Sequence, residues 1–202
     1  MKQWTIAGFL ALALAVGSAG PARANLITNG GFETGDFTGW TTDSFNIVEC
    51  GSSGTGVPSH TLNCAAALGA VGTPNSLKQT IPTVPGGTYV LSFWEESDGK
   101  TPNVFQANWD GNTVLGPVLD DLAHGYPINS STFTVVASTA STTVEFLGQN
   151  DNGFLGLDDV SVEPQASGVA AVPEPASLTL FGLGLGSLVG YQWRRRQRTV
   201  TK

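Results

Sequence analysis

Thr88-Tyr89-Val90-Leu91-Ser92-Phe93-Trp94-Glu95-Glu96, residues 88–96, is the most strand-like segment of the sequence. Successive side chains of a β-strand point to opposite faces of its sheet, so the order of residues in this stretch assigns each of them to a face. The face toward the core is expected to hold Tyr89, Leu91 and Phe93, and the other face to hold Val90, Ser92, Trp94 and Glu96. The stretch therefore predicts a long, half-buried strand.

The segments on both sides of this strand have the same character. Helical periodicity is absent between Asn25 and Pro164, where runs of Val, Thr, Phe and Tyr are separated by clusters of Gly, Asn, Asp and Pro. This pattern predicts an all-β sandwich. Further strands are expected at residues 76–81, 104–109, 132–136, 142–147 and 154–162. We expect residues 104–109 to continue the sheet of residues 88–96, and residues 132–136 to pair with residues 142–147 across a short turn.

The outward residues of two of these strands suggest a ligand-binding face. If residues 104–109 pair near residues 88–96, Gln106 and Asn108 join Trp94 and Glu96 on one face. An aromatic plane beside amides and a carboxylate suits a sugar, whose C–H face stacks while its hydroxyls need donors and acceptors. The alternative is that a loop or the second sheet covers Trp94.

The two ends of the chain differ from the middle. Met1 and Lys2 precede an apolar run through Val16, and Ala22-Arg23-Ala24 supplies a small-x-small cleavage site. This pattern predicts a cleaved N-terminal signal peptide at residues 1–24, the alternative being a retained anchor. A β-sandwich domain at residues 25–164 and a linker at residues 165–172 are expected to follow.

The C-terminal end combines an apolar run with a basic cluster. Residues 176–193 are apolar, and four arginines follow them directly. As a helix at about 1.5 Å per residue the run reaches roughly 27 Å, just enough for a thin bilayer. We therefore expect a C-terminal transmembrane helix with its arginines on the cytoplasmic side and everything before it outside.

Pro173, Glu174 and Pro175 precede this helix, and the three-part tail at residues 173–202 resembles the sorting tail of PEP-CTERM proteins of Gram-negative bacteria. The resemblance implies that Pro173, Glu174 and Pro175 form a sorting motif recognised by an exosortase, which cuts near it. It further implies a protein that is held briefly at the inner membrane and then reaches the cell surface or extracellular matrix. The alternative is an ordinary C-terminal membrane anchor.

Charge and cysteine usage agree with export. Residues 25–172 contain 15 acidic residues, two lysines and no arginine, a net charge of −13, which excludes ordinary nucleic-acid binding. Cys50 and Cys64 both lie in the part expected outside, where oxidation is permitted, so we expect a disulfide between them. Two reduced thiols are the alternative.

The opening residues Asn25 to Glu33, together with Trp40, and the closing residues Leu157 to Val162 resemble galactose-binding-like β-jelly-roll modules, a group with many carbohydrate-binding modules. This resemblance implies a jelly-roll β-sandwich whose first and last strands lie side by side. It also implies a structural calcium ion at those ends, and carboxylate oxygens are the ligands that calcium prefers. Its side-chain ligands would be Glu33 together with Asp158 or Asp159, since adjacent strand residues face opposite ways. Otherwise these acids are solvated or cap backbone amides.

Nothing in the sequence favours catalysis. Glu95 and Glu96 are adjacent on a strand and point to opposite faces, so they cannot flank one glycosidic bond. His60 and His124 belong to no known catalytic motif. We therefore expect a non-enzymatic surface or matrix protein that binds or associates with exopolysaccharide. The alternative is a structural or adhesive envelope protein without specific sugar binding.

Overall fold

The computed structural model describes residues 24–43, 45–51, 54–127 and 130–165. The expected signal peptide, linker, sorting motif (Pro173, Glu174 and Pro175) and transmembrane helix lie outside the described residues, apart from Ala24 and Gln165 at their borders. Within the described ranges, no helix has the length and apolar character needed to span a bilayer.

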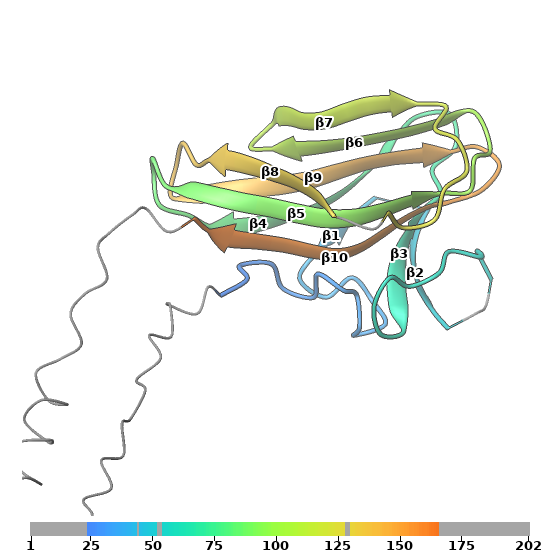
Figure 1. Cartoon of the computed structure of the whole chain (residues 1–202), viewed down its shortest axis with the longest axis horizontal. Coiled ribbons are helices and arrows are strands. Elements are labelled where there is room, and N and C mark those ends of the chain that lie inside the picture. Colours follow the sequence, from blue (N-terminus) through green and yellow to red (C-terminus); the bar gives the residue numbers. More distant parts are fainter. Residues whose placement is uncertain (1–23, 44, 52–53, 128–129, 166–202) are drawn as a thin grey trace, which may run out of the picture. The chain divides into compact units, whose positions relative to one another are not determined.

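In the described residues, ten strands form two five-stranded sheets in which every pairing is antiparallel (Figure 1). The first sheet has the order β1-β4-β9-β6-β7 and the second the order β2-β3-β10-β5-β8. The strands are β1 Thr41–Thr42, β2 Asn46–Cys50, β3 Cys64–Leu68, β4 Asn75–Pro82, β5 Thr88–Ser97, β6 Asn103–Trp109, β7 Asn112–Leu119, β8 Ser131–Val136, β9 Ser141–Asn150 and β10 Leu155–Pro164. The expected all-β sandwich is confirmed.

The alternation of residues 88–96 is realised in β5, where Tyr89, Leu91 and Phe93 are buried. These side chains face those of the first sheet. Phe93 packs edge-to-face on Phe146 of β9, with 5.0 Å between ring centroids, and also contacts Phe105 of β6. Aromatic rings prefer such offset and edge-to-face arrangements, which contribute beyond the burial of their area. The core therefore sits between the two sheets.

The strands at 76–81, 104–109, 132–136, 142–147 and 154–162 are all present, but two expected pairings are wrong. β6 does not continue the sheet of β5, because it pairs with β7 and β9 in the other sheet. β8 does not pair with β9, because β8 lies on the edge beside β5. In both cases a short connection carries the chain from one sheet to the other, as it can where two sheets pack face to face.

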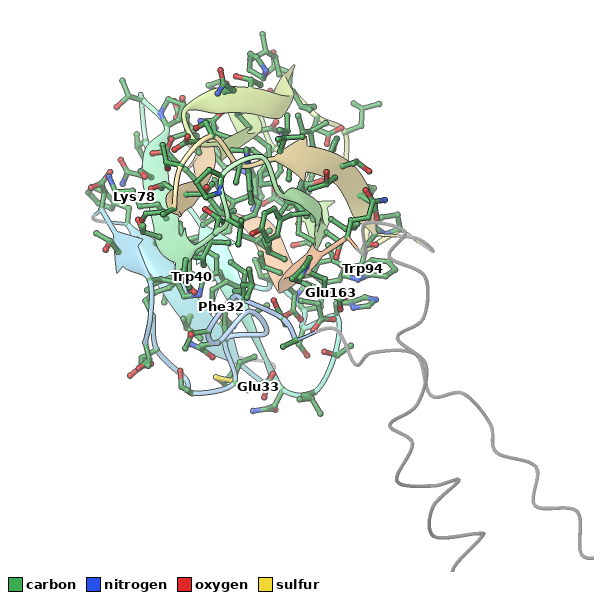
Figure 2. The ribbon with its side chains drawn as sticks, turned by 90° about the vertical axis from the view of Figure 1, so that its left-hand side faces the viewer. Phe32, Glu33, Trp40, Lys78, Trp94 and Glu163 are labelled. Atoms are coloured by element: carbon green, nitrogen blue, oxygen red, sulfur yellow. A yellow bond between two sulfur atoms is a disulfide. The ribbon has the colours of Figure 1, made fainter. Side chains whose placement is uncertain are left out.

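The beginning of the domain lies along its end. The backbone amide of Leu26 donates to the carbonyl of Val162 at 2.8 Å, and that of Val160 donates to the carbonyl of Gly30 at 2.9 Å. The opening segment thus runs beside β10 without forming a regular strand, while β1 pairs with β4. Trp40 and Phe32, from the same region, are buried in the core (Figure 2).

The disulfide between Cys50 and Cys64 is confirmed, and it joins the paired ends of β2 and β3. It closes the segment between these strands at its base. That segment carries His60 and Thr61, which reach β10 across 97 to 99 residues of sequence. The crosslink therefore helps to position His60 and Thr61.

Candidate functional site

A bulge in β10 brings two neighbouring acids to the same loop. The register of β10 shifts between Asp158 and Ser161, and Asp159 has a positive φ of 48°. Asp158 Oδ2 accepts hydrogen bonds from the backbone amides of His60 and Thr61, while the carboxylate of Asp159 bonds the side chains of the same two residues. A bulge re-aims side chains in this way, which the alternation rule does not anticipate.

These contacts place His60 flat on Trp94. The ring centroids are 3.8 Å apart with an interplanar angle of 17°, and Nδ1 of His60 is 2.7 Å from Asp159 Oδ2. Trp94 lies on the outer face of β5, apart from the core residues Phe32 and Trp40 (Figure 2). The loop therefore covers one face of the Trp94 ring, as the alternative from the sequence anticipated.

Tyr126 and Glu96 complete this surface. Tyr126 packs edge-on against His60, and its hydroxyl donates to the carbonyl of Pro58 at 3.0 Å. At Gly156 a Cβ would lie 2.6 Å from Glu96 Cγ and 2.9 Å from the Tyr126 hydroxyl, so a glycine leaves room for both side chains. We call the surface formed by His60, Trp94, Glu96 and Tyr126 the Trp94 face.

Burial governs the charge of the acids near this face. Glu96 is 7% exposed, and burial raises its pKa to about 7, with Asp98 adding to the rise and His124 opposing it. Burial also raises the pKa of Asp158 to about 6, against the amide hydrogen bonds that lower it. The pKa of Tyr126 is raised as well, by burial first and then by Asp158. Near neutral pH, Glu96 can therefore donate as well as accept a hydrogen bond.

The raised pKa of Glu96 predicts a pH-dependent stability. The folded state holds this proton more tightly than the unfolded state, so the stabilisation is fully present below about pH 4.5 and is lost as pH rises through about 7. In the presence of a chelator, Glu96→Gln should melt at a higher temperature than the parent at about pH 8, and this advantage should vanish at about pH 4.5. Thermal melts followed by circular dichroism measure the difference, and an equal difference at both pH values would contradict the prediction.

Gln106 and Asn108 do not join Trp94 and Glu96. They lie on β6 in the first sheet, whereas Trp94 and Glu96 lie on β5 in the second, so the expected four-residue site is not formed. Gln106 Nε2 donates to Asn108 Oδ1 at 2.7 Å, and Asn108 Nδ2 donates to Glu145 Oε2 at 3.0 Å. The side-chain amides of Gln106 and Asn108 thus belong to a row of hydrogen bonds on the outer face of the first sheet.

Glu33, Asp158 and Asp159, from which the calcium ligands were expected to come, lie around Gly31. A Cβ at Gly31 would be 3.4 Å from Asp159 Oδ1, 3.7 Å from Asp158 Oδ1 and 3.8 Å from Glu33 Cγ. Glu33 Oε1 accepts the backbone amides of Asn63 and Cys64 at 3.0 and 2.7 Å, next to the disulfide (Figure 2). These acids do not form a group of three ligand atoms within 4.8 Å of one another. In this arrangement Glu33 and Asp158 accept hydrogen bonds from backbone amides of the loop before β3. The three carboxylates therefore form only an incomplete set of calcium ligands.

Comparisons with known protein structures agree with the two-sheet fold of this domain. The enzymatically active domain of tailspike protein 4 of bacteriophage CBA120 matches with a TM-score of 0.50 and 16% identity, over 70% of this chain but only 21% of the tailspike chain. The K3 cleaved adhesin domain of Lys-gingipain from Porphyromonas gingivalis matches with a TM-score of 0.50 and 17% identity, over 70% of this chain and 99% of that domain. TmCBM61 in complex with β-1,4-galactotriose matches with a TM-score of 0.49 and 18% identity, over 70% and 99% of the two chains.

With its two antiparallel sheets, the domain has the jelly-roll sandwich fold that the sequence predicts. No curated protein matches the sequence. A family model described as the PEP-CTERM protein-sorting motif matches residues 171–196, which include Pro173, Glu174 and Pro175. The chain therefore carries a PEP-CTERM sorting motif, which marks it as an exported protein sorted at the membrane through an exosortase.

Proposed function

We propose that the jelly-roll domain is a non-catalytic module through which this exported protein associates with extracellular polysaccharide. The observation that carries the proposal is the Trp94 face, where three aromatic rings and a buried carboxyl group meet on the outer side of the second sheet. Aromatic rings stack on the apolar faces of sugars, and a few convergent polar groups fix the orientation of the ligand.

The chemistry of this face suits a neutral or weakly polar glycan. Glu96 supplies a carboxyl group that is protonated in part near neutral pH, and the Tyr126 hydroxyl lies beside it at Gly156. Glu95, the other glutamate of β5, points to the opposite side and contacts His124. The two glutamates therefore do not face a common cleft, which supports binding without hydrolysis.

Removing the Trp94 ring should weaken binding to polysaccharide. Because the ring supplies the main apolar platform, Trp94→Ala should lower the affinity at least tenfold, about 1.4 kcal/mol. A glycan array, followed by pull-down with the polysaccharide that scores highest, measures the effect. Gln106→Ala is the matched control, because Gln106 lies on the other sheet and its loss should leave binding unchanged.

Binding by Trp94→Ala as tight as that of the parent would rule out the Trp94 face as the site. A loss with Gln106→Ala alone would move the site to the first sheet. In both variants circular dichroism should show an unchanged β-sheet spectrum, so that a loss of binding is not a loss of fold.

Calcium at Glu33, Asp158 and Asp159 stays part of the proposal. These carboxylates come from the two ends of the domain, and a hard cation prefers such oxygen ligands. Calcium added to metal-free protein should then raise the melting temperature, since a ligand at 100 times its Kd stabilises the native state by about 2.7 kcal/mol. An unchanged melting temperature would remove calcium from the account.

A structural or adhesive role without sugar specificity is the second candidate. It is favoured by one observation, the stacking of His60 on one face of Trp94, which uses surface that a sugar would need. Failure of the parent protein to bind any glycan, with attachment to cells unchanged when exopolysaccharide synthesis is deleted, would favour this role.

A further inference from the structure

Three side chains able to ligate a metal meet at one end of the sandwich. Glu95, Asp121 and His124 each offer one ligand atom, and these atoms lie within 4.8 Å of one another. Glu95 belongs to β5 and points away from the Trp94 face, while Asp121 and His124 belong to the segment between β7 and β8. Across the described ranges, no other three histidine, cysteine, aspartate or glutamate side chains come together in this way.

The separations suit a metal ion with short bonds. Nε2 of His124 lies 3.0 Å from Asp121 Oδ2 and 3.6 Å from Glu95 Oε2. Ligand atoms bound at about 2.0 to 2.1 Å around a tetrahedral metal lie about 3.3 to 3.4 Å apart. Both separations from His124 Nε2 are within a few tenths of an ångström of that value, and the ligand oxygens of Glu95 and Asp121 lie within 4.8 Å of each other.

The histidine ring is oriented as in a metal ligand. Nδ1 of His124 is 3.0 Å from the carbonyl oxygen of Gly125, which can only accept, so Nδ1 carries a proton and donates it. In the neutral ring, the lone pair of Nε2 then points toward the two carboxylates. A backbone acceptor on one ring nitrogen commonly fixes the tautomer that leaves the other nitrogen to bind a metal.

Glu95 provides a second, independent indication. Its side chain is 13% exposed, and its Oε1 is buried without a hydrogen-bond partner. A buried oxygen without a partner is costly, and native structures contain few of them. The oxygen of Glu95 that faces His124 is Oε2, so a cation held by both oxygens of Glu95 would satisfy Oε1 and offset the charge of two neighbouring carboxylates.

The segment that carries Asp121 and His124 is held by its backbone. Asn103, which is 1% exposed, accepts from the amide of Asp121 at 2.8 Å and donates to its carbonyl at 2.9 Å. His124 and Ser97 exchange two backbone hydrogen bonds of 2.9 and 3.1 Å. The ligand side chains are therefore presented by a framework that does not depend on them, which is the preorganisation a specific site needs.

We propose that Glu95, Asp121 and His124 bind a divalent transition-metal ion of the Zn²⁺ class. An imidazole nitrogen with two carboxylate oxygens suits zinc better than calcium, which takes oxygen ligands almost exclusively. Water would supply the fourth ligand, because zinc is usually four-coordinate. This site uses none of Glu33, Asp158 and Asp159 and does not depend on the polysaccharide role.

Calorimetric titration with zinc chloride tests the proposal on the purified protein, prepared without a histidine tag and stripped of metal by a chelator. Zinc should bind saturably, and His124→Gln and Asp121→Asn should each weaken binding at least tenfold. Asp121→Asn keeps the backbone contacts of residue 121, so its effect reports the lost ligand rather than a lost fold. Calcium chloride should compete at least tenfold less well than zinc.

His60→Gln is the matched control, because His60 is the other of the two histidines and also contacts a carboxylate, that of Asp159. It should leave zinc affinity unchanged. The proposal is overturned if zinc does not bind saturably, if Asp121→Asn binds as well as the parent, or if His60→Gln costs as much as His124→Gln. Displacement of zinc by an equal concentration of calcium would overturn the choice of metal class.

Discussion

Replacing both Cys50 and Cys64 by serine should lower the free energy of unfolding by about 3 kcal/mol, because the disulfide closes a loop of about 15 residues in the unfolded chain. The two cysteines are 14 residues apart in the sequence. For a domain of about 140 residues, this loss corresponds to a fall of about 10 °C in melting temperature. Urea denaturation followed by circular dichroism measures it.

The same variant should also lose affinity for polysaccharide, because the crosslinked segment positions His60, one of the three aromatic rings of the Trp94 face. The parent protein treated with a reducing agent is the control, and its denaturation midpoint should match that of the double-serine variant. If the double-serine variant had the same denaturation midpoint as the oxidised parent, the disulfide would add nothing to stability.

Replacing Pro173, Glu174 and Pro175 by alanine should abolish sorting of the chain. These residues lie within the matched sorting motif at residues 171–196, and an exosortase is expected to recognise them. Nearly all of the variant should therefore keep its arginine-rich end and stay with the membrane fraction, whereas the parent should lose that end. Mass spectrometry of the C-terminus, in cells with and without the sorting enzyme, measures the outcome.

Gln165→Ala combined with Ser167→Ala is the control, since both residues lie in the expected linker before the matched motif. This double variant should be processed like the parent. If the parent itself keeps its arginine-rich end in both kinds of cell, the tail is a permanent anchor rather than a sorting signal.

The strand at residues 88–96 could be predicted because its faces are decided locally. Tyr89, Leu91 and Phe93 alternate with more polar residues, and burial of one face of a strand fixes which set points inward. The turn after β6 is also determined locally: Asp110 and Gly111 adopt positive φ values of 51° and 77°. Asp-Gly is the sequence that such hairpin turns favour.

Strand partners could not be predicted, because they depend on contacts far along the chain. β6 follows β5 directly but joins the other sheet, and this choice separates Gln106 and Asn108 from Trp94. β3 was missed for a different reason. Its sequence, Cys-Ala-Ala-Ala-Leu, has little intrinsic strand preference, but all five residues are buried and small side chains fit between layers on both faces.

The site residues that the sequence missed are those placed by loops. His60 and Tyr126 reach the Trp94 face from segments remote in sequence, and His124 reaches Glu95 in the same way. Asp158 and Asp159 point to one loop only because β10 bulges between Asp158 and Ser161, with Asp159 at a positive φ inside the bulge. A histidine without a nearby motif thus carries little signal in sequence, although both histidines of this chain have carboxylate partners in the fold.

If the domain attaches to extracellular polysaccharide, retention of the protein in the matrix must depend on that polysaccharide. The fraction of protein held in the matrix should be measured in the producing cells and in cells whose exopolysaccharide synthesis is deleted, with the sorting enzyme intact in both. The processed protein should move from the matrix to the medium when the polysaccharide is absent, and Trp94→Ala should do so even when it is present. Equal retention of the parent protein in both kinds of cell would contradict this attachment.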